Sequence, residues 1–546
     1  MATVTVNGKS VDIGSERLNC VQAAEKAGVE VPHYCWHPDL TVVASCRMCL
    51  VEVGDTKPDG TVAMQPKVVP GCQTLVRDGS VILTDSPRAK AAQASTLEGL
   101  LLNHPLDCPV CDKAGECKLQ DYSFTFGNAQ SRMVDEKNAP PNKPHLSEKI
   151  TLFTDRCIMC TRCVRFAREI SGTAELLVIN RGHHAEIDIF PGEPLNNKLS
   201  GNVVDLCPVG ALGSKDFLYK QRVWFLKSKP AVCGGCSTGC SIHVDHNKDI
   251  VFRLRARTNP LSQGSFICDE GRWGYHYANS KDRLGRPRMR AGQSGKLVAA
   301  PWSDVVREMR KDFASAIKDS AGQVWVVLSP FLTVEEAYLL ASYIVRQSKS
   351  VRLALGHVPV VGEDDTFPKD RKGRPVTPVK FTIRAEKCPN RRGIEEVLKH
   401  FEGRVTPFAD AVAAAEKGQV RAMFLTGGYP KPDWMPAADA ASIAKVPLLA
   451  VSDLFDSVVS ATAKYLLPAT TFAEKDGTWV NYAGLAQSVG RTVKPPMEVR
   501  AEGQIFFELA ERRGLYTADA VRKEVAVDLP VFSALKNDLG ELGVRL

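Results

Sequence analysis

The placement of cysteine is the feature that most restricts how this chain can fold. Of its 17 cysteines, only Cys388 lies beyond residue 270, and most of the others fall into closely spaced groups. Evenly spread cysteines would suggest small buried hydrophobic residues, whereas grouped cysteines suggest metal ligands. A secreted disulfide framework needs a small domain and a signal peptide, and the N-terminus has no charged segment followed by an apolar one. The sequence therefore predicts metal or cluster sites in the N-terminal half, in a reducing compartment.

Four groups of possible ligands follow one another along the chain, and we call them sets one to four. In order, they are Cys35, Cys46, Cys49 and Cys72; His104, Cys108, Cys111 and Cys117; Cys157, Cys160, Cys163 and Cys207; and Cys233, Cys236, Cys240 and Cys268. Each set offers four ligands, which is the number that a [2Fe–2S] or [4Fe–4S] cluster requires. Cys20 and Cys388 are left over, and we expect both to be structural.

Set one has a long loop and a distant fourth cysteine, an arrangement that suits a [2Fe–2S] cluster. Alternating residues on either side of Asn7-Gly8 predict a β-hairpin over residues 3–13. A helical segment follows from Leu18 to Lys26 and ends near Gly28, a residue suited to a helix cap. These elements favour a ferredoxin-like β-grasp domain over residues 1–84. A zinc site is the alternative, because Cys-x-x-Cys pairs also bind zinc.

Set two combines a histidine with a compact cysteine triplet, within a unit predicted over residues 85–133 that opens with a helix from Pro87 to Asn103. A neutral imidazole in place of a thiolate would make a cluster less negative and raise its reduction potential. Zinc held by three cysteines and one histidine is the alternative on local spacing.

Sets three and four each place a cysteine triplet on one tight loop, in units predicted over residues 147–225 and 226–282. The spacing of set three and its closing Cys207-Pro208 follow the pattern of bacterial ferredoxins. No second triplet lies between Cys163 and Cys207, so we expect Cys207 to return to the same cluster. No Cys-x-x-Cys pair is followed by histidine, which excludes c-type haem attachment.

The sequence changes character after residue 283, and the fold class expected for the whole chain is α+β multidomain. Four apolar stretches predict buried strands, and helical patterns alternate with them, one of which opens with a capping box at Thr333–Glu336. This alternation predicts an α/β layered domain with a mostly parallel sheet over residues 283–546. The predicted strands are 324–328, 351–355, 420–425 and 446–451; residues 135–149 are expected to be a linker and 362–378 a loop.

Several functional classes are not expected. No stretch of about 18 apolar residues occurs, so we expect no direct membrane insertion. The net charge of +8 comes without a basic run interleaved with aromatic residues, so we expect no nucleic-acid partner. We find neither a nucleophile–base pair nor Gly-x-Gly-x-x-Gly, so we expect no catalytic residue here and place the NADH, flavin and quinone sites on other chains.

Over residues 1–282 the order of the four sets resembles that in the large peripheral-arm subunit of respiratory NADH:quinone oxidoreductase (complex I). The stretches that carry the resemblance are Cys46-Arg-Met-Cys49, His104-Pro-Leu-Asp-Cys108-Pro109 and Cys163-Val-Arg-Phe-Ala-Arg-Glu169. The resemblance implies one [2Fe–2S] cluster on set one and three [4Fe–4S] clusters on sets two to four. It further implies that electrons pass from NADH through a flavin subunit and sets one to three to a small two-cubane ferredoxin-like subunit, with set four off the path and structural.

The C-terminal half resembles the molybdopterin oxidoreductase fold. Residues 473–487 are similar to a pterin-side motif of that family but carry Ala483 and Leu485 where an acidic residue and an arginine are usual. Beyond residue 283 only Cys388 could supply a thiolate to a metal. We therefore expect a degenerate domain without molybdopterin.

The resemblance implies an electron-transfer subunit of a translocase-type enzyme, peripheral on the cytoplasmic side of the bacterial inner membrane. One alternative is the diaphorase or electron-transfer subunit of an NAD-linked formate dehydrogenase or hydrogenase. Another is a binding or scaffold module in which zinc only holds structure. Metal analysis separates the last possibility, because four clusters require about 14 irons and four zinc sites about four colourless ions.

Overall fold

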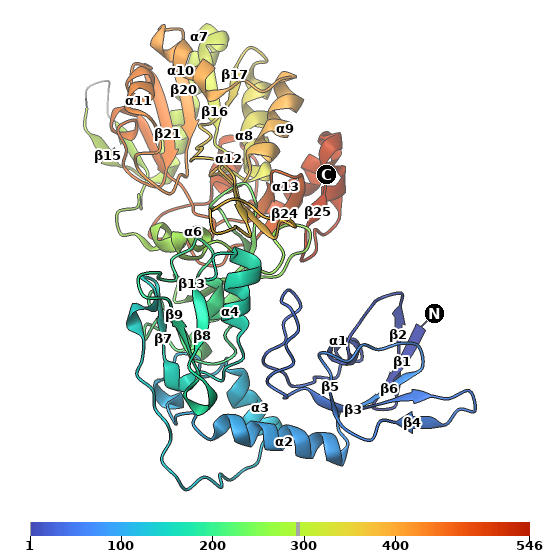
Figure 1. Cartoon of the computed structure of the whole chain (residues 1–546). Helices are drawn as coiled ribbons and strands as arrows, with labels where there is room; N and C mark the ends of the chain where they lie inside the picture. The colour runs from blue at the N-terminus through green and yellow to red at the C-terminus, as the bar shows by residue number, and fades with distance from the viewer. Residues whose placement is uncertain (1, 291–294) are drawn as a thin grey trace. The chain divides into compact units, whose positions relative to one another are not determined.

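The computed structural model describes residues 2–290 and 295–546 (Figure 1). Contacts between residues divide the chain into two compact units. Unit one comprises Met1–Phe225 and Phe367–Val379, and unit two comprises Leu226–Thr366 and Lys380–Leu546. Sets one to three thus belong to unit one and set four to unit two. All sixteen predicted ligands lie within the described residues.

Unit one begins with a mixed β-sheet of strand order β2-β1-β6-β3-β4, with β5 paired to β3. β1 is antiparallel to β2, as the hairpin prediction requires, and parallel to β6. Helix α1 (Cys20–Lys26) starts with a capping box between Asn19 and Gln22, and Gly28 follows it with φ +73°. The hairpin, the helix and the β-grasp arrangement predicted from the sequence are confirmed. The strands are β1 (Ala2–Val6), β2 (Lys9–Gly14), β3 (Leu50–Thr56), β4 (Val62–Met64), β5 (Val69–Pro70) and β6 (Ser80–Leu83).

The rest of unit one consists of short elements joined by long loops. The helix predicted from Pro87 is α2, capped by the Ser86 side chain, and residues 135–149 are mostly irregular, as expected for a linker. Helix α4 continues into one π-helical turn, Ala167–Ser171. The helices are α2 (Pro87–Leu101), α3 (Lys118–Phe126), α4 (Arg162–Phe166) and α5 (Asn202–Leu206); the strands are β7 (Ile150–Leu152), β8 (Leu176–Ile179), β9 (Glu186–Ile189) and β10 (Leu212–Ser214).

Unit two opens with the antiparallel sheet β11 (Lys227–Val232), β12 (Ser241–Asn247) and β13 (Ile250–Ala256), which precedes helix α6 (Asp269–Trp273). A seven-stranded sheet follows, in the order β15-β14-β22-β21-β20-β16-β17. Its five strands from β22 to β17 are parallel, and β14 runs antiparallel to β22. The four predicted strands are confirmed as β16 (Val324–Leu328), β17 (Arg352–Leu355), β20 (Ala422–Thr426) and β21 (Leu448–Asp453); the others are β14 (Arg288–Arg290), β15 (Leu297–Ala299) and β22 (Tyr465–Pro468).

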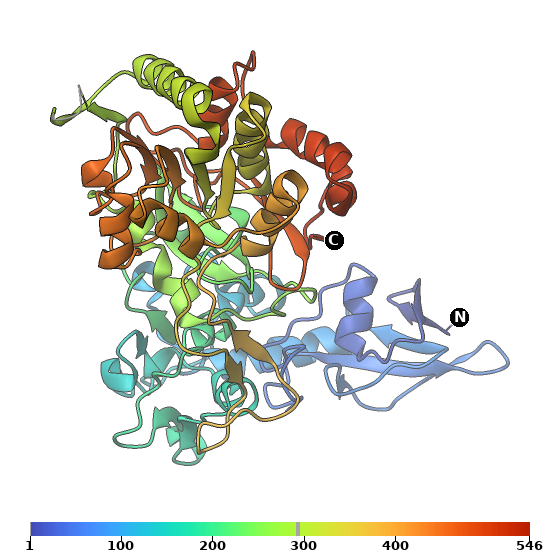
Figure 2. The same ribbon diagram turned by 90° about the horizontal axis from the view of Figure 1, so that it is seen from above.

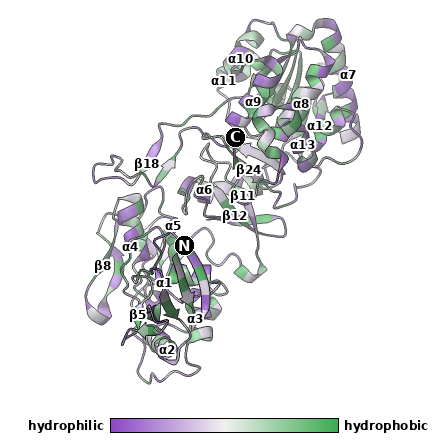
Figure 3. Cartoon of the chain, turned by 90° about the vertical axis from the view of Figure 1, so that its right-hand side faces the viewer, coloured by the Kyte–Doolittle hydropathy of each residue, from purple (hydrophilic) through white to green (hydrophobic). Residues whose placement is uncertain are grey.

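Helices cover both faces of this sheet, so unit two contains a three-layer α/β domain (Figure 2). Alternate residues of β16 face opposite cores: Val326 packs with α7, α8 and α12, whereas Val327 packs with α10 and α11. Figure 3 shows hydrophobic residues gathered in the strands and polar residues on the outer helices. The helices are α7 (Trp302–Ser320), α8 (Val334–Gln347), α9 (Arg391–Glu402), α10 (Phe408–Glu416), α11 (Ala437–Ile443), α12 (Glu502–Leu509) and α13 (Ala518–Asp528).

Two small sheets complete unit two. One is β23 (Gly477–Val480), β24 (Leu485–Val489) and β25 (Val544–Arg545), and the other pairs β18 (Asp365–Phe367) with β19 (Phe381–Ile383). The prediction that residues 362–378 form only a loop is wrong in part, because β18 lies inside that range. In residues 2–290 and 295–546, no helix combines the length and the hydropathy that a membrane crossing requires.

Candidate iron–sulfur sites

Set one lies in the loop before β3 and in the turn after β5. Within it, the Cys35 side chain bonds to those of Cys46 and Cys72, and Cys49 bonds to Cys72. These bonds lower the pKa of Cys35 and Cys49, and the pKa values of their partners Cys46 and Cys72 are raised. The four thiols therefore lie within hydrogen-bonding reach of one another. The four residues predicted for set one lie together and fit a thiolate-ligated cluster.

Backbone N–H groups point at sulfur in this loop. The N–H of Cys35 donates to Cys46 Sγ at 3.4 Å, and the N–H of Cys72 donates to Cys49 Sγ at 3.5 Å. Ala44 and Arg47 take positive φ angles of 50° and 58°. Such left-handed residues turn successive N–H groups inward, an arrangement that occurs at many iron–sulfur sites.

Set three closes around a small cavity that all four of its cysteines line. Cys157, Cys160 and Cys163 come from the loop into α4, and Cys207 directly follows α5. Burial raises the pKa of Cys157 to about 12 and that of Cys160 to about 11, so these thiols need a bound cation to ionise at neutral pH. Met159, with φ 51°, donates its N–H to Cys157 Sγ at 3.4 Å. The donors and the cavity fit a cluster.

Set two is gathered less completely. Cys117 lies beside Cys111, and the N–H of Cys111 donates to the carbonyl of the exposed Cys108 at 3.3 Å. Within the part of the chain that the structure describes, no contact joins His104 to a cysteine of its set; both His104 and Cys111 lie near Arg156. Burial, followed by the charges of Lys137 and Arg156, lowers the pKa of His104 to about 4. Its imidazole is therefore neutral at pH 7, the form that binds metal.

Set four lies at the edge of the first sheet of unit two. Cys233 follows β11, Cys240 precedes β12 and Cys268 caps the N-terminus of α6. Cys233 donates its N–H to the carbonyl of Cys240 at 2.8 Å, and Gly271 donates to Cys268 Sγ at 3.3 Å. Burial, then the charges of the neighbouring thiols, raise the pKa values of Cys240 and Cys268. The set lies together, as a cluster would require.

The segment that resembles a pterin-side motif supports set four directly. Asn481 Nδ2 donates to the carbonyl of Thr238 at 3.0 Å, and Gln487 Nε2 donates to the carbonyl of Gly239 at 2.7 Å. Both carbonyls lie in the loop between Cys236 and Cys240. Residues 473–487 therefore hold the cysteine loop, a role that the sequence did not reveal.

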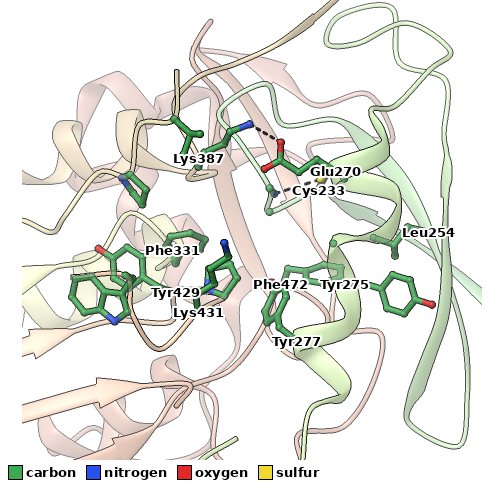
Figure 4. A pocket seen from close by; sticks show the side chains of 18 of the residues that line it. Cys233, Leu254, Glu270, Tyr275, Tyr277, Phe331, Lys387, Tyr429, Lys431 and Phe472 are labelled. Carbon is green, nitrogen blue, oxygen red and sulfur yellow. Dashed lines mark hydrogen bonds and ion pairs between the residues drawn. The ribbon is translucent and has the colours of Figure 1, made fainter. Parts of the chain in front are cut away.

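A cavity of about 480 Å³ lies beside Cys233, within unit two (Figure 4). Its wall includes the ion pair between Lys387 and Glu270, with Nζ and Oε2 2.6 Å apart. Neither the buried Cys388 nor any of the described residues 473–487 contributes to the wall of this cavity. Aromatic side chains make up much of the wall: Tyr275, Tyr277, Phe331, Tyr429, Trp434 and Phe472.

Among residues 2–290 and 295–546, no group of three or more His, Cys, Asp or Glu side chains is arranged to hold one metal ion.

Comparison with known proteins identifies four regions of the chain. Residues 1–87 match a 2Fe-2S iron-sulfur cluster binding domain, and residues 93–132 match the NADH-ubiquinone oxidoreductase-G iron-sulfur binding region. Residues 147–213 match the ferredoxin-like domain of NADH-quinone oxidoreductase subunit 3, and residues 397–512 match molybdopterin oxidoreductase. The family models thus assign 2Fe-2S and 4Fe-4S binding domains to unit one and a molybdopterin oxidoreductase-like domain to unit two.

Relatives named as the G subunit of NADH-quinone oxidoreductase support the same assignment. The protein of Streptomyces coelicolor is 36% identical over 346 residues, which are 63% of this chain and 39% of that protein. The protein of Rickettsia conorii is 36% identical over 64% of this chain and 49% of its own length. The matched region thus spans less than half the length of these relatives. A chain of a solved NAD+-reducing [NiFe]-hydrogenase is 24% identical, with a TM-score of 0.35 over 41% of this chain and 91% of that one. Over the matched residues, the chain is similar to the G subunit of NADH-quinone oxidoreductase.

Proposed function

We propose that this chain carries electrons within an NADH:quinone oxidoreductase, from a flavin subunit towards quinone. The observation that carries the proposal is the gathering of cysteines from separate segments, most completely Cys157, Cys160, Cys163 and Cys207 around one cavity. The sixteen residues of sets one to four would hold one [2Fe–2S] and three [4Fe–4S] clusters.

Hydrogen bonds connect the three sets of unit one. Arg165 bonds to main-chain carbonyls of Cys35 in set one and Cys160 in set three. The N–H of Lys118, next to Cys117 of set two, donates to the carbonyl of Pro208, next to Cys207 of set three, at 3.1 Å. These contacts support a relay in which electrons pass among sets one to three inside unit one.

The chain's own residues would bind and tune the clusters, which when bound supply one-electron redox chemistry. Thiolates hold the iron, N–H groups bond to sulfur, and burial excludes water; these are the factors by which proteins set cluster potentials. His104 would give the second cluster a neutral ligand and so a higher potential. We propose no NADH, flavin or quinone site on the chain.

Set four and the α/β domain would have structural roles. Asn481 and Gln487 connect the set four loop to the C-terminal sheet, and we propose that the domain works without molybdopterin. The partners would be the flavin and NADH-binding subunit and a small two-cubane subunit, in a peripheral assembly on the cytoplasmic side of the bacterial inner membrane. The names of the relatives favour this function over that of a formate dehydrogenase or hydrogenase subunit.

Replacing Cys160 with alanine in the assembled complex tests the proposal. The variant should lose the third cluster and its electron paramagnetic resonance signal. NADH-driven quinone reduction should stop while flavin-linked ferricyanide reduction continues. The matched control is Cys20→Ala, because Cys20 is also buried in unit one but lies outside all four sets. Quinone reduction at the wild-type rate in Cys160→Ala would remove set three from the path.

A further inference from the structure

Two arginines of helix α4 extend from the ligand loop of set three to that of set one, both inside unit one. Arg165 is 5% exposed. Its guanidinium donates to the carbonyl of Thr41 at 2.6 Å, to that of Cys160 at 3.3 Å and to that of Cys35. One side chain therefore joins the backbone of a ligand in set one to the backbone of a ligand in set three.

Arg162 makes a second connection between the same loops. Its guanidinium donates to the carbonyl of Trp36 at 2.5 Å and to the carbonyl of Leu206 at 3.3 Å. Trp36 follows Cys35 of set one, and Leu206 precedes Cys207 of set three. The two arginines thus connect the cysteine triplet and the closing Cys207 segment of set three to the same short segment of set one.

In the described parts of the chain, no carboxylate forms an ion pair with Arg162 or Arg165, and every hydrogen-bond acceptor of these two side chains is a main-chain carbonyl. The Nε–H group of each is buried and has no partner. Burying a charge without an opposite charge is costly, so this pair requires an anion nearby. Thiolate-ligated clusters on sets one and three are anionic and become more negative on reduction.

We propose that Arg162 and Arg165 are positioning residues that hold the clusters of sets one and three at a fixed separation and raise the reduction potentials of both. The inference rests on the proposed function, since it needs clusters on these two sets. The carbonyl bonds fix the loops, and the two uncompensated charges stabilise the extra negative charge of each reduced cluster. The charge effect and the positioning effect can be tested separately, because lysine keeps the charge of Arg165 but not its forked geometry.

The experiment is a redox titration of the anaerobically purified full-length chain, followed by electron paramagnetic resonance. At an effective dielectric constant of about 20, one charge about 10 Å away changes a reduction equilibrium by about tenfold, which is about 59 mV for a one-electron couple. Arg165→Gln should lower both midpoint potentials by about that amount. Arg165→Lys should keep potentials close to wild type but weaken the magnetic interaction between the two clusters.

The matched control is Arg132→Gln, since Arg132 is exposed in unit one and pairs with Glu98. In this variant the midpoint potentials of both clusters should equal those of the wild type. Full iron content with unchanged potentials in Arg165→Gln would overturn the proposal, as would equal shifts in the glutamine and lysine variants. If Arg165→Gln does not load iron, the same titration is carried out on Arg162→Gln. Both midpoint potentials should again fall, and unchanged potentials at full iron content would again overturn the proposal. Wild-type protein without iron would instead remove the proposed function itself.

Discussion

At the scale of single residues, Gly210 is required by space rather than by backbone conformation. A Cβ atom at this position would lie 2.1 Å from Cys111 Sγ and 3.3 Å from Lys113 Cβ. Gly210 follows Cys207, so the closing loop of set three packs directly on a ligand of set two. No sequence pattern signalled this contact, because the two cysteine groups are far apart in the chain.

We therefore expect Gly210→Ala to displace Cys111 and to lose the second cluster, about four irons per chain, while the third cluster remains. Iron analysis with electron paramagnetic resonance measures this. Gly99→Ala is the control, since nothing lies within 4 Å of its added Cβ. That variant should keep all clusters and gain up to about 1 kcal/mol of stability from helix propensity. Wild-type iron content in Gly210→Ala would contradict the expectation.

Asp453 is a buried carboxyl group whose ionisation should be visible in stability. It accepts hydrogen bonds from Trp434 Nε1 at 2.8 Å and from the N–H of Leu454 at 2.8 Å, yet burial raises its pKa to about 6. A carboxyl group whose pKa is higher in the folded state stabilises the fold at low pH, and that contribution is lost as the pH rises through the folded value.

Between pH 4 and pH 7, the wild type should therefore lose roughly 2 kcal/mol of unfolding free energy relative to Asp453→Asn, which cannot ionise. Urea unfolding at several pH values measures this difference. The other titrating groups are the same in both proteins, so their contributions to the pH dependence of the unfolding free energy cancel. A difference that does not change with pH would show that Asp453 has an ordinary pKa.

At the scale of elements, helix α8 shows what local sequence can and cannot predict. The capping box between Thr333 and Glu336 was predicted and is present. The second role of Glu336 was not predictable, because its carboxylate also pairs at 3.1 Å with Lys475, whose Nζ lies 3.1 Å from Glu502 of α12. All three side chains are buried. Residues distant in sequence thus form one buried ion cluster.

Lys475→Met should destabilise unit two by about 3–5 kcal/mol, because it leaves two carboxylates buried without a cation. Denaturant unfolding followed by circular dichroism measures the change. Lys399→Met is the control: Lys399 pairs with Glu396 on an exposed face of α9, and its loss should cost less than about 1 kcal/mol. Equal effects of the two substitutions would mean that the buried cluster contributes no more than a surface pair.

At the scale of the whole molecule, the sequence predicted what periodicity and ligand spacing encode. The hairpin at Asn7-Gly8 and the strand Val324–Leu328 follow from local patterns, and the close spacing of the cysteine triplets predicted the ligand loops. Contacts formed only in the folded chain were not predictable. Examples are the bonds of Arg165 across sets one and three, and the short strand β18, which depends on pairing with β19. Residues 367–379 likewise join unit one although the residues on either side belong to unit two.

The metal content of the intact chain is the most general consequence of this arrangement. Anaerobically purified protein should be brown and contain about 14 irons per chain, with matching acid-labile sulfide and neither molybdenum nor extractable pterin. Cys268→Ser should lower the iron content by about four. Cys388→Ser, at a buried cysteine of the same unit outside the four sets, should not change it. Thiolates that bind iron can also bind zinc. Colourless protein with about four zinc ions would therefore show that the four sets are structural zinc sites and do not transfer electrons.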